Sequence, residues 1–176
     1  AAQTTGYRLE LFTKIVPTLK KIWIFFDGNN TVSREYFKLA ESAAKKLGFV
    51  AAAYPIKSGE ELKTTLASLQ AENGAAIFQI SDELMESEAE YLFETARAKK
   101  IPTMFNEESW AIAGALAAYG PNYLEMGRQA GRLADKLLKG ESAAALPIER
   151  ASKFDLTLNY RTARFIDVPL SSETLK

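Results

Sequence analysis

The feature that most constrains this fold is a repeated alternation of short apolar runs with amphipathic segments. Residues Lys21–Asp27 read KIWIFFD and contain five consecutive apolar side chains. A run without polar alternation is typical of a strand that is covered on both faces, as in a parallel sheet packed between helices. Polar residues 28–31 follow this strand, and apolar residues then recur at helical spacing until Gly48. The start of the chain therefore predicts one strand–helix unit.

The helix of this first unit is predicted to present one continuous apolar face to the sheet, because its apolar residues lie three, four or seven positions apart. The residues expected on that face are Val32, Tyr36, Leu39, Ala40, Ala43 and Leu47.

The same unit recurs along the chain. Further strands are predicted at 49–56, 75–80, 101–105 and 115–119. Helices are predicted at 60–70 with Ser58 as N-cap, after Ser81 and Asp82, around Trp110, and over 122–139. A lead-in helix over 6–16 precedes the first strand, and a late strand over 153–159 follows an Ala- and Pro-containing connector. We expect an α/β fold in which a parallel sheet with right-handed crossovers is flanked by helices.

Composition excludes several classes of protein. The 22 basic and 22 acidic residues cancel, so a nucleic-acid partner is not expected. The chain has no cysteine and no histidine, which removes thiol nucleophiles, cysteine zinc centres and Ser–His triads. We therefore expect a protein that is not an enzyme and that needs no metal or cofactor.

Targeting signals are not visible in the sequence. No apolar run approaches the roughly 18 residues that span a bilayer. The chain begins at Ala1 and shows no signal peptide, which is expected of a processed or trimmed product.

Polar clusters follow four of the predicted strands. They occupy residues 27–30, 81–83, 106–109 and 119–122. Because the carboxyl ends of parallel strands lie on one edge of a sheet, these clusters are expected to meet in a ligand-binding crevice. Helix N-termini at that edge suit a carboxylate, and an acidic side chain beside them suits an ammonium group. A zwitterion such as an amino acid would use both.

The candidate ligand-binding residues come from these clusters. They are Asp27, Asn29, Asn30, Asp82, Asn106, Trp110 and Tyr119. Asp and Asn at such positions are also what helix N-capping requires without any ligand. Asp82 is the strongest candidate, on the hypothesis that Ser81 caps the helix and leaves the carboxylate free. Trp110 and Tyr119 either contact a ligand or pack in the interior.

The segment from Gly114 onward carries a set of motifs. These are GALA at 114–117, Tyr-Gly at 119–120, GRQ at 127–129, LKG at 138–140, Leu-Pro at 146–147 and KFDLTLN at 153–159. In this combination the chain resembles the ABC-type substrate-binding proteins within the type I periplasmic binding proteins. The preceding GYRLELFTKIVPTLKKI is similar to that family's entry into its second lobe. The resemblance covers nearly the whole chain. It implies a protein that binds a small solute in the periplasm or elsewhere outside the cytoplasm and delivers it to an ABC permease in the membrane. A lipid anchor in the parent protein is an option that the resemblance leaves open.

The resemblance also implies a domain division. Residues 1–113 and 151–176 would form the second lobe, and 114–150 would cross to a first lobe that is absent from this chain. Helix 122–139 would then expose its apolar residues Tyr123, Met126, Leu133, Leu137 and Leu138. Exposing large apolar side chains forfeits roughly 1.5–3 kcal/mol each. We therefore expect this helix to dock elsewhere on the chain or on a second copy, in a homodimer formed by segment exchange.

Asp27 departs from the family pattern, in which the corresponding turn often begins with Asn, so ligand identity stays open. Two other hypotheses remain at this stage. A flavodoxin-like cofactor carrier would use residues 27–31 as a phosphate loop, although Asp27 would repel a phosphate. A receiver-like signalling domain would use Asp82 as phosphoacceptor, but the strand ending at Phe105 is followed by Asn106 and not by the lysine that such a site needs. An isolated lobe would also supply only half of the contacts to a ligand.

Overall fold

The structure, a computed structural model, describes residues 2–170 and contains one six-stranded sheet. The strands are β1 (Lys21–Asp27), β2 (Val50–Ile56), β3 (Ala75–Phe78), β4 (Thr103–Phe105), β5 (Ala117–Pro121) and β6 (Phe154–Leu158). Their order across the sheet is β2-β1-β3-β4-β5-β6. Neighbours from β2 to β5 pair in parallel, and β6 pairs antiparallel with β5. The predicted α/β fold with a mainly parallel sheet is confirmed.

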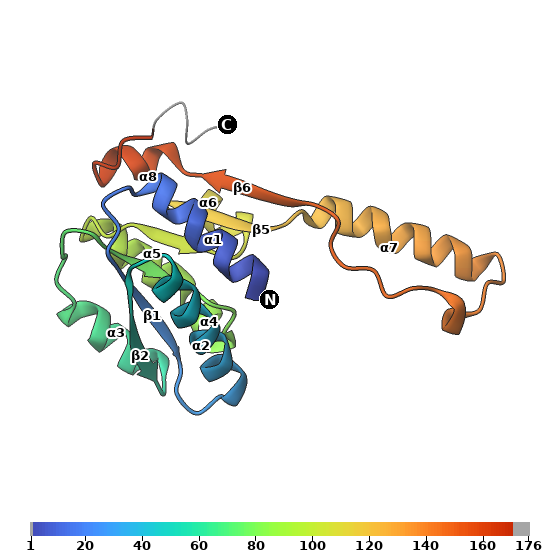
Figure 1. The fold of residues 1–176 in the computed structure, drawn as a ribbon, viewed down its shortest axis with the longest axis horizontal. Helices are drawn as coiled ribbons and strands as arrows, with labels where there is room; N and C mark the ends of the chain where they lie inside the picture. Colours follow the sequence, from blue (N-terminus) through green and yellow to red (C-terminus); the bar gives the residue numbers. More distant parts are fainter. Residues whose placement is uncertain (1, 171–176) are drawn as a thin grey trace.

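Helices cover both faces of this sheet (Figure 1). One layer contains α1 (Ala2–Ile15), α2 (Thr31–Lys46) and α8 (Tyr160–Phe165). The opposite layer contains α3 (Gly59–Ser68), α4 (Glu83–Ser87), α5 (Ala89–Ala98) and α6 (Glu108–Ala113). Strand β1 shows why both layers form, because Ile24 lies in one apolar core and Phe25 in the other, each nearly inaccessible to solvent. Successive side chains of a strand point to opposite faces, so an unbroken apolar run demands two covers.

Two details of the predicted helices are wrong. The helix expected after Asp82 is two helices, since α4 ends at Ser87 and α5 begins at Ala89. The apolar face predicted for α2 is only partly buried. Ala40 is buried and Tyr36 and Ala43 pack at the margin of the core, whereas Val32, Leu39 and Leu47 are exposed. Leu39 and Leu47 line a groove that α1 and α2 leave between them, so this part of the predicted face meets solvent.

The long helix α7 (Tyr123–Leu138) lies apart from both layers. With the short 3₁₀ turn η1 (Ala143–Ala145) and the chain that returns to β6, it forms an arm, residues 122–153, that extends away from the sheet (Figure 1). Most of its large apolar side chains are exposed, and Leu138 retains 88% of its accessible surface. The expectation that this helix docks elsewhere on the same chain is therefore wrong for the described residues. Docking on a second copy stays a prediction.

Candidate ligand-binding site

A polar pocket lies where β1 and β3 end at the carboxyl edge of the sheet. Its volume is about 360 Å³, and its lining residues are Asp27, Asn30, Asp82, Glu83, Leu84 and Ser87. Strands β1 and β3 are neighbours in the sheet, and their parallel pairing brings residues 55 positions apart in sequence to one place. The predicted convergence of strand-end polar groups is thus realised for Asp27, Asn30 and Asp82.

Asp82 ties the two strand ends together. Its Oδ2 accepts a hydrogen bond from the backbone N–H of Asp27 at 2.7 Å, and its Oδ1 accepts one from the N–H of Met85 at 3.0 Å. Asp82 is therefore itself the N-cap of α4. The hypothesis that Ser81 caps this helix and frees the carboxylate is wrong, because Asp82 has the extended backbone that aims its carboxylate at the helix N–H groups. Asp82 is also buried, with 4% of its surface accessible.

The turn after β1 is held by its own side chains. Asp27 Oδ1 accepts a hydrogen bond from the Asn29 N–H at 2.8 Å, and Asn30 Oδ1 caps α2 by accepting from Val32 and Ser33. Asn29 is exposed and does not line the pocket. Among the described residues, Asp27 Oδ2 and the side-chain NH₂ group of Asn30 have no protein partner. These two groups are the ones that the turn leaves available to a ligand.

The charge of the pocket is negative. Asp27, Asp82 and Glu83 contribute carboxylates, and none of the six lining residues is basic. A site with clustered carboxylates stabilises a cationic group, provided that the group also brings hydrogen-bond donors. The arrangement therefore suits a primary ammonium group and disfavours a phosphate, which argues against the flavodoxin-like hypothesis.

Besides Asn29, three more of the predicted residues, Asn106, Trp110 and Tyr119, lie outside this pocket. The Trp110 ring is partly buried and packs against the core residues Phe93 and Phe105, at centroid distances of 6.5 and 6.2 Å. Tyr119 stacks on Phe154 at 5.8 Å, and burial is the main cause that raises the pKa of its hydroxyl. Asn106 Oδ1 and Trp110 Nε1 are buried without a protein partner in the described part of the chain.

Sequence analysis did not single out Glu83, Leu84 and Ser87 as lining residues. Glu83 belongs to the polar cluster 81–83 that follows the third predicted strand. Ser87 lies four positions after Glu83, on the same face of α4. The helical spacing would have indicated Ser87 once Asp82 was placed as the cap of α4.

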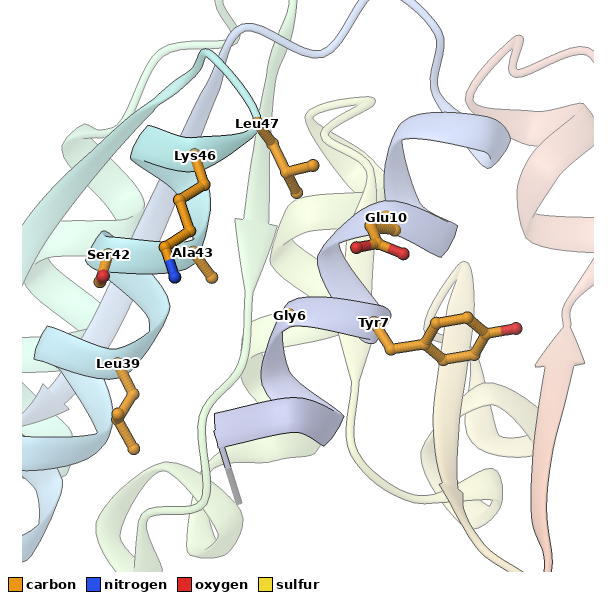
Figure 2. Close-up of a pocket in the computed structure, with 8 residues that line it drawn as sticks. All are labelled: Gly6, Tyr7, Glu10, Leu39, Ser42, Ala43, Lys46 and Leu47. Atoms are coloured by element: carbon orange, nitrogen blue, oxygen red, sulfur yellow. The ribbon is translucent and has the colours of Figure 1, made fainter.

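A wider groove lies between α1 and α2 and has a volume of about 510 Å³ (Figure 2). Leu39 of α2 and its C-cap Leu47 line one side, and Gly6 and Glu10 of α1 lie on the other (Figure 2). This groove runs between two covering helices, away from the strand ends where loops and side chains of several elements converge. The acidic pocket is therefore the better candidate for a ligand site.

The family model described as ABC transporter substrate binding protein matches residues 2–176. The chain belongs to this family. The tyrosine-binding protein of Clostridioides difficile is 27% identical over 169 residues, which cover 96% of this chain and 49% of that protein. The chain thus spans about half the length of this curated relative.

Solved structures have the same fold. A conserved domain protein from Vibrio cholerae matches with a TM-score of 0.82 at 20% identity, over 97% of this chain and 57% of the other. An ABC domain in complex with L-Trp from Streptococcus pneumoniae gives 0.80 at 19% identity, over 98% and 59%. An open, ligand-free substrate-binding protein with adhesive properties from Clostridium difficile gives 0.76 at 26% identity, over 93% and 55%. In residues 2–170, none of the helices is long and apolar enough to cross a membrane.

Proposed function

We propose that this chain forms the second-lobe half of the solute-binding component of an ABC transporter, and that its acidic pocket holds the ammonium group of an amino acid. The observation that carries this proposal is the pocket itself, which gathers three carboxylates and no basic side chain at the carboxyl edge of the sheet. Two of the proteins similar to this chain are named for amino acids, a tyrosine-binding protein and an ABC domain in complex with L-Trp. A free α-amino group is the cation that these ligands share.

The remaining contacts would come from a first lobe. The tyrosine-binding relative is about twice as long as this chain. The arm also exposes apolar side chains that a partner surface would cover. In this proposal the two lobes close around the solute by hinge bending. A permease in the membrane then recognises the closed form on the side of the membrane that faces away from the cytoplasm. Binding is driven by desolvated hydrogen bonds and one ion pair, and no covalent bond changes.

The test uses the full two-lobed protein and isothermal titration calorimetry with L-tyrosine and L-tryptophan. Asp27→Asn and Glu83→Gln each remove one carboxylate from the pocket and are expected to weaken binding about tenfold or more, because a hydrogen bond to a charged group contributes about 1.5–3 kcal/mol. Glu41→Gln, which removes the same charge from an exposed position on α2, is the matched control and should bind normally.

A ligand analogue separates the ammonium contact from general affinity. The deaminated compound 3-(4-hydroxyphenyl)propionate keeps the ring and carboxylate of tyrosine and lacks the ammonium group. We expect it to bind weakly to the wild-type protein and to be insensitive to Asp27→Asn. If it binds as tightly as L-tyrosine, the acidic pocket does not hold an ammonium group.

A further inference from the structure

A second pocket at the same sheet edge has the opposite chemistry. Its volume is about 210 Å³, and its lining residues are Thr4, Thr5, Arg8, Tyr36, Ile80 and Ser81. Ile80 and Ser81 line this cavity, while the next residue, Asp82, lines the acidic pocket. The two cavities are therefore neighbours beyond the end of β3, yet this one contains a guanidinium group and no carboxylate.

Within residues 2–170, Arg8 is buried without a counter-charge. It retains 5% of its accessible surface, and its guanidinium lies 4.4 Å from the centre of the Phe78 ring. Nη2 donates to the carbonyl oxygen of Gln79 at 2.6 Å and, at 3.5 Å, to that of Met104. Nε is buried with no partner, and among the described residues no carboxylate forms an ion pair with Arg8. Burial lowers the pKa of Arg8 to about 9.

This arrangement is unfavourable as a purely structural device. A buried charge without an opposite charge is among the most costly groups in a protein interior. The guanidinium presents its donors as a planar fork whose geometry matches the two oxygens of a carboxylate or another oxyanion. An anion in the adjoining cavity would supply the charge that the protein does not.

We infer that the cavity beside Arg8 is a subsite for an oxyanion, either the carboxylate of an organic ligand or a small free anion such as sulfate. Arg8 provides the charge. Thr4, Thr5 and Ser81 line the same cavity, and each carries a hydroxyl group that can serve as a neutral donor to the remaining oxygens. This inference rests on the Arg8 cavity alone and does not depend on the ligand proposed for the acidic pocket.

The test observes Arg8 directly by ¹H–¹⁵N NMR of arginine side chains in this chain. Sodium sulfate and sodium acetate are titrated separately, with sodium chloride at matched ionic strength as the reference. We expect one Nε–H resonance, the one missing from the Arg8→Gln spectrum, to shift and saturate with the oxyanions and not with chloride. If that resonance responds neither to sulfate nor to acetate, the inference is overturned.

Thermal unfolding provides an independent measurement. Sulfate or acetate should raise the melting temperature of the wild-type chain, and Arg8→Gln should weaken the apparent anion affinity about tenfold or more. Arg164→Gln removes the same charge from an exposed position on α8 and should leave the response unchanged. An equal response in both variants overturns the inference. If Arg8→Gln does not fold, the resonance is assigned by conventional triple-resonance NMR, and the wild-type titration decides.

Two further arms identify the source of the anion. Saturation by sulfate and acetate alike indicates a site for a free anion. Saturation by acetate and by an amino acid indicates a site for a ligand carboxylate, provided that sulfate and the methyl ester of the same amino acid do not saturate the site. Either pattern supports the subsite. The Asp27→Asn variant should leave the Arg8 response intact, so failure of the acidic pocket and failure of this subsite are distinguishable.

Discussion

The body of the protein and its arm differ in what their amphipathic helices cover. Helices α2 and α7 both have 16 residues. Helix α2 packs on the sheet and buries Ser33, Ala40 and Ala44, whereas α7 buries only Gln129. An amphipathic pattern therefore indicates that a helix has an apolar face suited to burial, but it does not indicate whether the same chain or another surface covers that face.

The two regions are also held by different forces. Large apolar side chains on both faces of the sheet stabilise the body. The arm is held by polar contacts, in which the Gln129 NH₂ group donates to Glu149 and to the Arg150 carbonyl, and its side-chain oxygen accepts from the Ser152 N–H. We therefore expect substitutions in the body to change global stability and substitutions in the arm to act locally.

The largest expected effect is in the body. Phe93 is 2% exposed and packs against Phe105 and Trp110. Phe93→Ala should lower the free energy of unfolding by about 3–5 kcal/mol, because it leaves a cavity in the core. Leu138→Ala, at the exposed end of the arm, should change it by no more than about 0.5 kcal/mol. Urea unfolding followed by circular dichroism measures both, and equal losses would contradict the distinction between body and arm.

Glycines in the two regions give the next contrast. A Cβ atom at Gly120 in β5 would overlap the backbone carbonyl of Asn106, so Gly120→Ala should cost about 1–3 kcal/mol through displaced backbone. Gly127 in α7 has nothing within 4 Å of its Cβ position, and Gly127→Ala should stabilise the helix by about 0.5–1 kcal/mol. Thermal unfolding checks the sign of each change, and the prediction fails if both variants shift in the same direction.

The next prediction concerns the side-chain hydrogen bonds of Gln129 within the arm. Gln129→Ala removes its hydrogen bonds to residues 149–152 and should cost about 1–2 kcal/mol locally. Amide hydrogen exchange should become faster in residues 149–152 and stay unchanged in β1 and β3. Gln70→Ala, at an exposed position, is the matched control. Faster exchange throughout the sheet would show that the arm and the body unfold together.

The smallest effect concerns Asp155 at the base of the arm. The hydrogen bond from the Asn122 side chain is the main cause that lowers the pKa of Asp155 below 3.8, and Lys153 adds to it. A carboxyl group with a lowered pKa stabilises the folded state at pH values above its pKa in the unfolded chain. This contribution is lost as pH falls through the pKa of the folded state. NMR titration should show the pKa of Asp155 rising toward its ordinary value in Asn122→Ala, and an unchanged value would contradict the role given to Asn122.

Much of the fold followed from local patterns. The unbroken apolar run of β1 indicated a sheet with two covers, and Ser58 caps α3 as its spacing predicted. The candidate site followed only in part. Asp27, Asn30 and Asp82 converge because the sheet is parallel, but Asp82 caps α4 in place of Ser81. Cap choice depends on the backbone angles of one residue, which neighbouring residues in sequence do not determine.

The element types, the parallel sheet and the edge at which polar residues collect were predictable from the sequence, because they follow from unbroken apolar runs and from apolar residues at the helical period of 3.6. Which side chains share a cavity became clear from the folded structure alone. Arg8 illustrates the difference. It lies on α1 four residues before the buried Phe12, and only the packing of α1 against the sheet shows that its charge is buried with no opposite charge among the described residues. Burial and pairing depend on contacts between distant segments, and local sequence patterns do not contain those contacts.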